Sequence, residues 1–113
     1  PEILLGDNYN EKVDVFSFAM CLAEMRSRHL PWQGAKQRTD TTQVPYKVTR
    51  GDRPTWQLKC DKQGNPKKDF LNILIQRCWD QDPARRPQFE DIVVEIKDQY
   101  VASRRSSSLR GHE

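Results

Sequence analysis

Residues 12–26 constrain the fold of this chain more than any other segment, because apolar side chains would lie on almost every side of a helix formed there. The apolar residues are Val13, Val15, Phe16, Phe18, Ala19, Met20, Cys21, Leu22, Ala23 and Met25. A helix that is hydrophobic all round is normally buried among neighbours on every side. Arg26 and Arg28 favour a helix C-terminus, and Pro31 prevents continuation. We therefore predict a helix over residues 12–26 that is buried on all sides.

Two further segments have helical periodicity. The first should begin near Asn65, a possible cap, and Pro66, which suits a first turn. Its apolar residues are Phe70, Leu71, Leu74, Ile75, Cys78 and Trp79. The second has Glu90 and Asp91 in its first turn and repeats Phe89, Ile92, Val93, Ile96 and Tyr100 at spacings of three and four. Trp79 and Phe89, large aromatics at helix ends, are expected to fill the core. A small helix is also expected after Pro45, between loops.

The composition limits the chain to one small core. Only 35% of its 113 residues are hydrophobic, and two amphipathic helices cannot cover every side of the helix at 12–26. The sequence therefore looks like part of a larger, mainly helical domain. Its 19 basic and 16 acidic residues leave a net charge of +3, which requires no nucleic-acid partner. Because no apolar stretch is long enough to span a bilayer, we expect no membrane partner and a cytoplasmic location.

Cysteine and histidine give no sign of a metal or catalytic centre. Cys21, Cys60 and Cys78 are odd in number and lack the close spacing of metal or redox motifs, so we expect reduced structural thiols. His29 and His112 are isolated, and neither receives a catalytic role. Residues 102–113 lack core-forming side chains and should form a flexible, basic, serine-rich tail.

Four blocks resemble, in the right order, blocks of the protein kinase domain. Pro1-Glu2 is similar to the end of the Ala-Pro-Glu motif that closes the activation segment, and residues 9–18 resemble the start of the kinase F helix. Pro31-Trp32 and the run Gly-Asp-Arg-Pro at 51–54 come next in the kinase order. Residues 78–89 resemble the block Cys-Trp-x-x-Asp-Pro-x-x-Arg-Pro-x-Phe.

The resemblance implies that residues 1–101 are an incomplete C-terminal lobe of a protein-kinase-like fold, containing the F, G, H and I helices. It is closest to the tyrosine-kinase-like group of serine/threonine kinases. Tyrosine kinases usually have Trp where Phe16 stands and Gly where Ala19 stands. These departures favour serine/threonine specificity and leave tyrosine specificity as the alternative.

The resemblance assigns structural roles to three charged residues. Glu2 and Arg86 would form an ion pair that ties the end of the activation segment to the loop between the H and I helices. Two solvated charges are the alternative. Asp14 would anchor the catalytic loop by accepting hydrogen bonds from its backbone amides, and a plain helix N-cap is the alternative.

The resemblance also implies that the parent protein transfers the gamma-phosphate of ATP, with magnesium, to Ser or Thr of protein substrates. The phosphate loop, the ATP-pairing Lys, the catalytic Asp and the magnesium ligands do not occur in this sequence. We therefore expect no catalytic, cofactor-binding or metal-binding residue here and an inactive fragment. A pseudokinase or scaffold parent is the main alternative, and a stand-alone helical interaction domain is a weaker one. The string Arg104-Arg105-Ser106-Ser107 resembles a basophilic kinase target, although a solvated tail explains it as well.

Overall fold

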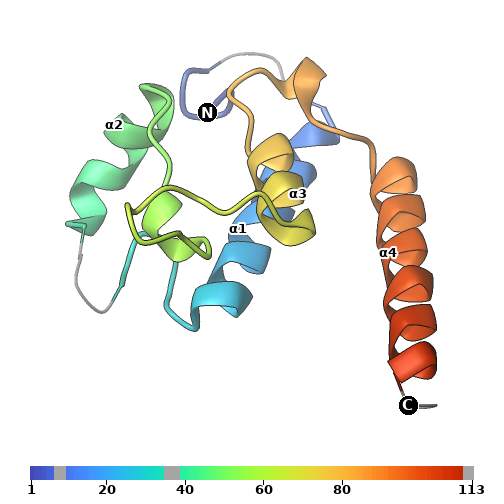
Figure 1. Cartoon of the computed structure of the whole chain (residues 1–113). Coiled ribbons are helices and arrows are strands. Elements are labelled where there is room, and N and C mark those ends of the chain that lie inside the picture. The colour runs from blue at the N-terminus through green and yellow to red at the C-terminus, as the bar shows by residue number, and fades with distance from the viewer. Residues whose placement is uncertain (7–9, 35–38, 111–113) are drawn as a thin grey trace.

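The structure is a computed structural model of the chain that describes residues 1–6, 10–34 and 39–110, with the backbone alone for 106–110. Tyr9, His112 and the side chains of Ser106 and Ser107 therefore lie outside the described part. Four α-helices are α1 (Lys12–Ser27), α2 (Val44–Thr49), α3 (Phe70–Cys78) and α4 (Phe89–Arg110) (Figure 1). Three 3-10 turns are η1 (Thr41–Gln43), η2 (Thr55–Gln57) and η3 (Pro83–Arg85). Within these described ranges the fold is mainly helical, as predicted, and it contains no strand beyond an isolated bridge between Cys60 and Pro66.

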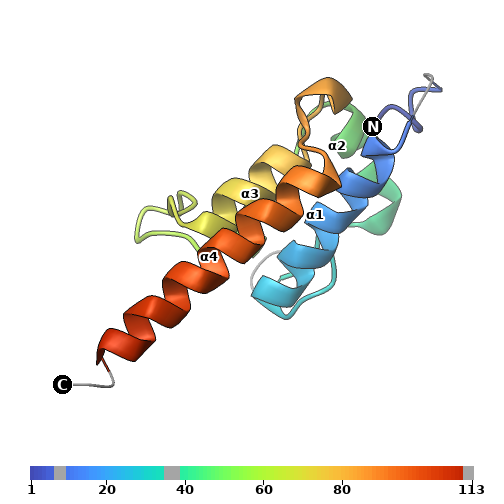
Figure 2. The same ribbon diagram turned by 90° about the vertical axis from the view of Figure 1, so that its right-hand side faces the viewer.

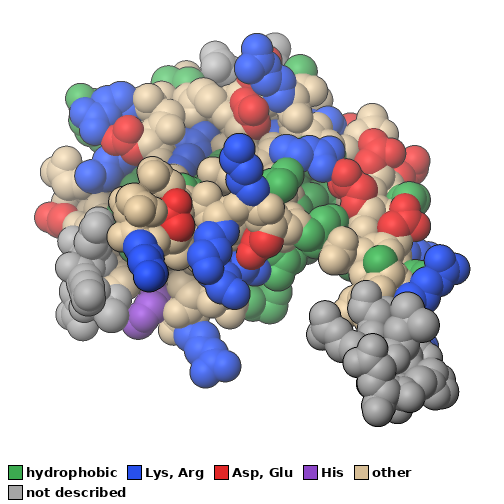
Figure 3. Space-filling view, in the orientation of Figure 1, with side chains coloured by type: hydrophobic (Ala, Val, Ile, Leu, Met, Phe, Trp, Pro, Cys, Tyr) green, Lys and Arg blue, Asp and Glu red, His purple; other side chains and the backbone are tan. Residues whose placement is uncertain are grey.

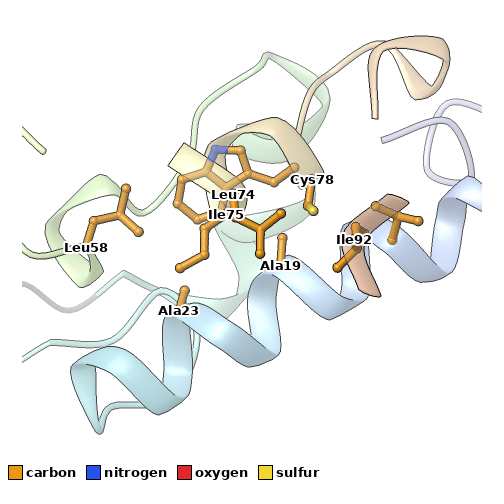
Figure 4. Close-up of a cluster of buried hydrophobic side chains, with 9 residues drawn as sticks. Ala19, Ala23, Leu58, Leu74, Ile75, Cys78 and Ile92 are labelled. Carbon is orange, nitrogen blue, oxygen red and sulfur yellow. The ribbon is translucent and has the colours of Figure 1, made fainter. Parts of the chain in front are cut away.

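The core forms where α1 lies against α3 (Figure 4). From α1 the small residues Ala19 and Ala23 are fully buried beside Val15. They face Leu74, Ile75 and Cys78 of α3, and the cluster is completed by Leu58, Trp79 and Ile92. Small side chains on one helix let the larger aliphatic side chains of the other interdigitate, which is the packing that a dense interior requires.

Helix α1 is not buried on all sides, so that prediction is wrong for the chain as it stands. Met25 is 68% exposed, and Cys21 is also exposed. The cause is a shortage of neighbours, because α3, η2 and Ile92 cover one face of the helix only. The exposed side chains of Ile3, Leu4 and Leu5 add to the apolar surface.

Helix α3 begins later than predicted. Its N-cap is Asp69, whose carboxylate accepts a hydrogen bond of 2.9 Å from the backbone amide of Asn72. Asn65 and Pro66 instead belong to a backbone hairpin, in which Pro66 pairs with Cys60. Asp69 lies three residues before the amide from which it accepts, which is the usual spacing of an N-cap. Asn65 and Pro66 lie too far from α3 to serve its first turn.

Helix α4 continues through Arg110, across residues where the sequence analysis expected a flexible tail. Glu90 and Asp91 in its first turn complement the helix dipole and favour the start of this helix. Ile92 is the one buried side chain among residues 89–105, and the later turns project beyond the other helices (Figure 2). The boundary at residue 101 stays a prediction. No helix in the described residues is both long and apolar enough to cross a bilayer.

A buried glutamine joins the loop after α1 to η2. Gln57 is 2% exposed, and its Oε1 accepts a hydrogen bond of 2.8 Å from the backbone amide of Trp32. Its Nε2 donates to the carbonyl oxygens of His29 and Leu30 at 3.1 and 2.9 Å. The side chain satisfies backbone groups that a buried loop would otherwise leave unpaired.

We predict that Gln57→Glu destabilises the fold by about 2–3 kcal/mol, because a carboxylate oxygen would replace the donor that faces two carbonyls. Chemical denaturation measures the change. The matched control is Gln76→Glu on the exposed surface of α3, which should cost less than about 0.5 kcal/mol. Equal effects at both positions would contradict the assigned role of Gln57.

Candidate functional site

The structure brings Glu2 and Arg86 together in a buried, two-point ion pair. Nη1 of Arg86 donates to Oε2 of Glu2 at 2.8 Å, and Nη2 donates to Oε1 at 2.9 Å. Glu2 is 6% exposed and Arg86 is 1% exposed. This parallel geometry uses the planar fork of the guanidinium, which Lys does not possess.

Arg86 is held in place by more than its carboxylate partner. Its Nε donates to the carbonyl oxygen of Asp80 at 2.9 Å, and Nη1 also donates to that of Lys12 at 2.9 Å. In return, Nζ of Lys12 donates to the backbone carbonyl of Arg86. One guanidinium therefore connects the N-terminal segment, the start of α1 and the residues around η3.

The residues next to Arg86 in sequence set the backbone that presents its side chain. Asp82 caps η3 by accepting a hydrogen bond of 3.0 Å from the amide of Ala84, and Pro83 sets the first backbone angle of the turn. The ring of Phe16 lies 5.1 Å from the guanidinium carbon of Arg86 and 5.0 Å from that of Arg53. An aromatic face attracts such cations when they are removed from water.

Arg53 is the residue of this site that the sequence analysis named only as part of a block. It donates from Nε to the carbonyl of Trp79 at 2.7 Å, and from Nη2 to the side chain of Gln81 at 2.8 Å. Burial, followed by the positive charge of Arg86, lowers the pKa of Arg53. The sequence feature that could have pointed to Arg53 is its place in the Gly51–Pro54 block. In the structure Arg53 joins that block to the Cys78–Phe89 block through its bonds to Trp79 and Gln81.

The charge state of Glu2 reflects two opposed effects. Burial raises the pKa of its carboxyl, and the hydrogen bonds and charge of Arg86 together outweigh burial and lower the pKa from 4.5 to about 2. Glu2 is therefore ionised at neutral pH and remains so in mild acid.

Asp14 is exposed in the first turn of α1. The N-cap position belongs to Glu11, whose side chain makes no cap hydrogen bond. The amide of Lys12 donates instead to Oδ1 of Asn10 at 3.0 Å, so the plain N-cap alternative for Asp14 is wrong. A carboxylate at this place complements the helix dipole. Its role as an anchor for another loop stays a prediction.

The other predicted residues have structural surroundings. Trp79 is 5% exposed and lies in the core as expected, whereas Phe89 is 40% exposed and touches Phe18 edge to face at 5.7 Å. The prediction that Phe89 fills the core is therefore wrong, because the side chain that the first turn of α4 places in the core is Ile92. Burial raises the pKa of the Cys78 thiol to about 11, which makes it a poor nucleophile. In the described part of the chain, no group of three His, Cys, Asp or Glu residues is placed to hold a metal ion.

The depressed pKa of Glu2 predicts a specific acid sensitivity. A carboxyl whose pKa is lower in the folded state stabilises the fold above its unfolded pKa, near 4.5, and the contribution disappears as pH falls through about 2. Urea titrations at several pH values should show a loss of about 3 kcal/mol across this window. The Glu2→Gln variant should lack this component, and an unchanged pH profile in that variant would contradict it.

Comparisons with known proteins place the chain in a family. A family model described as protein tyrosine and serine/threonine kinase matches residues 1–96. A probable serine/threonine-protein kinase of Dictyostelium discoideum is 35% identical over 103 residues, which cover 91% of this chain and 10% of that protein. A protein kinase and PP2C-like domain-containing protein of Oryza sativa subsp. japonica is 37% identical over 108 residues, covering 86% of this chain and 16% of that protein.

The chain thus spans only a small part of the length of these relatives. The match to the family model nevertheless includes both members of the buried pair and all the sequence blocks around them. The chain belongs to the protein tyrosine and serine/threonine kinase family and folds as a mainly helical part of the C-terminal lobe of its domain.

Proposed function

We propose that this chain is the rear part of the C-terminal lobe of a protein serine/threonine kinase of the tyrosine-kinase-like group. The complete domain would transfer the gamma-phosphate of ATP, bound with magnesium, to Ser or Thr side chains of cytoplasmic protein substrates. The relatives named as serine/threonine-protein kinases support this proposal. The phosphate loop, the catalytic Asp and the magnesium ligands would come from residues outside this chain.

The observation that carries the proposal is the buried Glu2–Arg86 pair. It joins residues 84 positions apart, and it removes both charges from water. In the complete domain this pair would hold the end of the activation segment against the turn before α4. The segment that positions a protein substrate would then have one firmly fixed end.

Asp14 would act as a positioning residue in the same domain. Its exposed carboxylate has no hydrogen-bond partner among the described residues, so it is free to accept backbone amides from a segment that packs on the start of α1. The catalytic loop would supply those amides. Asp14 would then orient the site and take no part in proton transfer.

We expect the longer protein to phosphorylate Ser or Thr with ATP and magnesium, and the 113-residue chain alone to show no saturable ATP binding. Isothermal titration with and without magnesium, and phosphate transfer to a protein substrate, are the two measurements. The reason is that electrostatic stabilisation of the transferring phosphoryl group needs the lysine and metal ligands that this sequence lacks.

An Asp14→Asn variant of the longer protein tests the positioning role of Asp14 in the same phosphate-transfer assay. It should lower the transfer rate while leaving the unfolding midpoint within the usual range of a surface change. A longer protein that binds its protein partners without phosphate transfer would instead favour a scaffold function. Micromolar, magnesium-dependent ATP binding by this chain would overturn the assignment.

The ion pair gives a second test of the assignment. Removing one partner of a buried pair leaves the other charge unpaired, so Arg86→Ala and Glu2→Ala should each cost about 3–5 kcal/mol in the longer protein. A double-mutant cycle by chemical denaturation should show that the second loss adds little. Arg86→Lys should recover only part of the stability, because a point charge makes one of the two hydrogen bonds.

The matched control for this cycle is the half-exposed pair between Arg77 and Glu95, whose side chains are 44% and 35% exposed and whose closest N–O distance is 2.7 Å. Its coupling should stay below about 1 kcal/mol. Additive losses of less than about 0.5 kcal/mol at Glu2 and Arg86 would mean that the two charges are solvated in the complete domain.

A further inference from the structure

A short basic loop before α3 stands apart from the kinase features described above. Residues 59–68, here called the lysine hairpin, contain four lysines and one aspartate, so this segment carries a net charge of +3. That value equals the net charge of the whole chain, which leaves the remaining residues neutral in sum. Lys59, Lys62, Lys67 and Lys68 are all exposed. Figure 3 shows blue side chains on the face of the molecule that carries this loop in Figure 1.

The backbone of the lysine hairpin is fixed by a buried side chain. Asn72 of α3 is fully buried, and its Nδ2 donates to the carbonyl oxygens of Lys59 and Lys67 at 2.7 and 2.9 Å. The amide of Lys67 also donates to the carbonyl of Lys59 at 2.8 Å. Both arms of the loop are therefore attached to the core at the positions from which lysines project.

The tip of the lysine hairpin is closed by its own aspartate and a glycine. Oδ1 of Asp61 accepts hydrogen bonds from the amides of Gln63 and Asn65 at 3.0 and 2.9 Å. Gly64 has φ of +84°, a conformation that other residues adopt only with strain. Asp61 is thus engaged in the turn and does not pair with a lysine.

The lysines are left without acidic partners in the described part of the chain. The nearby Asp69 caps α3 and forms an ion pair with Arg26, and none of the four lysines takes part in an ion pair there. Lys59 and Lys67 stand opposite each other, next to the Cys60–Pro66 bridge. Like charges directly across a strand pair destabilise it, so this arrangement costs stability that an anionic partner would recover.

We propose that the lysine hairpin is a docking surface for an acidic peptide segment of a partner protein, one rich in Asp or Glu. A rigid loop loses little conformational entropy when it binds, and several exposed cations at fixed positions can meet successive carboxylates of an extended peptide. The rest of the chain is neutral in sum, so the chain as a whole lacks the strong positive charge that is typical of nucleic-acid binding. The tip residues 61–65 carry no large apolar side chain that could insert into a membrane.

The test is fluorescence anisotropy of a labelled octaglutamate peptide with the full 113-residue chain at low salt. The test variant replaces Lys59, Lys62 and Lys67 by Gln, and the control variant replaces Lys97, Arg104 and Arg105 of α4 by Gln. Both variants remove three exposed positive charges. We expect the Kd to rise about tenfold or more in the test variant and to change less than about twofold in the control. Added salt should weaken binding by the unchanged chain.

A charge-neutral variant tests whether the fixed loop matters. Gly64→Ala keeps every lysine, meets no atom within 4 Å and strains only the turn, so the Kd should rise about two- to fivefold. Circular dichroism confirms that each variant keeps its helices. Equal loss of binding in the α4 control, no binding of octaglutamate at low salt, or an unaffected Gly64→Ala variant would overturn the proposal. Tighter binding to phosphatidylserine vesicles or to duplex DNA, lost in the test variant, would also overturn it in favour of those partners.

Discussion

The ion pair between Glu2 and Arg86 is the interaction on which the arrangement of this chain depends. A guanidinium with 1% of its surface exposed requires hydrogen-bond acceptors on all sides, and it finds them in Glu2 and in the carbonyls of Lys12 and Asp80. Each acceptor belongs to a different segment. The hydrogen bonds of the Arg86 guanidinium therefore determine the path of the N-terminal residues and of the turn before α4.

Such a pair contributes more to the choice of structure than to net stability. Desolvation of two charges offsets most of their attraction, and an apolar replacement of equal volume can be as stable. A misplaced chain, however, would leave an unpaired charge in the interior, which is a much larger penalty. The pair thus disfavours alternative packings of the segments that meet at Arg86.

The same principle operates on a smaller scale in the loops. Gln57 and Asn72 are buried amides whose partners are almost all backbone groups of irregular segments. Amides offer both donors and acceptors, so one side chain can satisfy two or three loop groups at once. The apolar core supplies the cohesion between α1 and α3, and these polar side chains decide where the connecting loops run.

The sequence by itself determined the helical class, the extent of α1 to within a residue, the presence of a small helix near Pro45, and the family. Apolar periodicity and proline positions depend on local backbone physics, and the four kinase blocks are strings of neighbouring residues. The start of α3 was missed because Asn65 and Asp69 are both good caps, and the choice fell to a hairpin held by Asn72. Only the tertiary structure decided which face of α1 is covered, how far Phe89 is exposed and that Arg53 and Arg86 share the ring of Phe16. These features depend on contacts between residues distant in sequence, and neither spacing nor composition records which neighbours are present to make them.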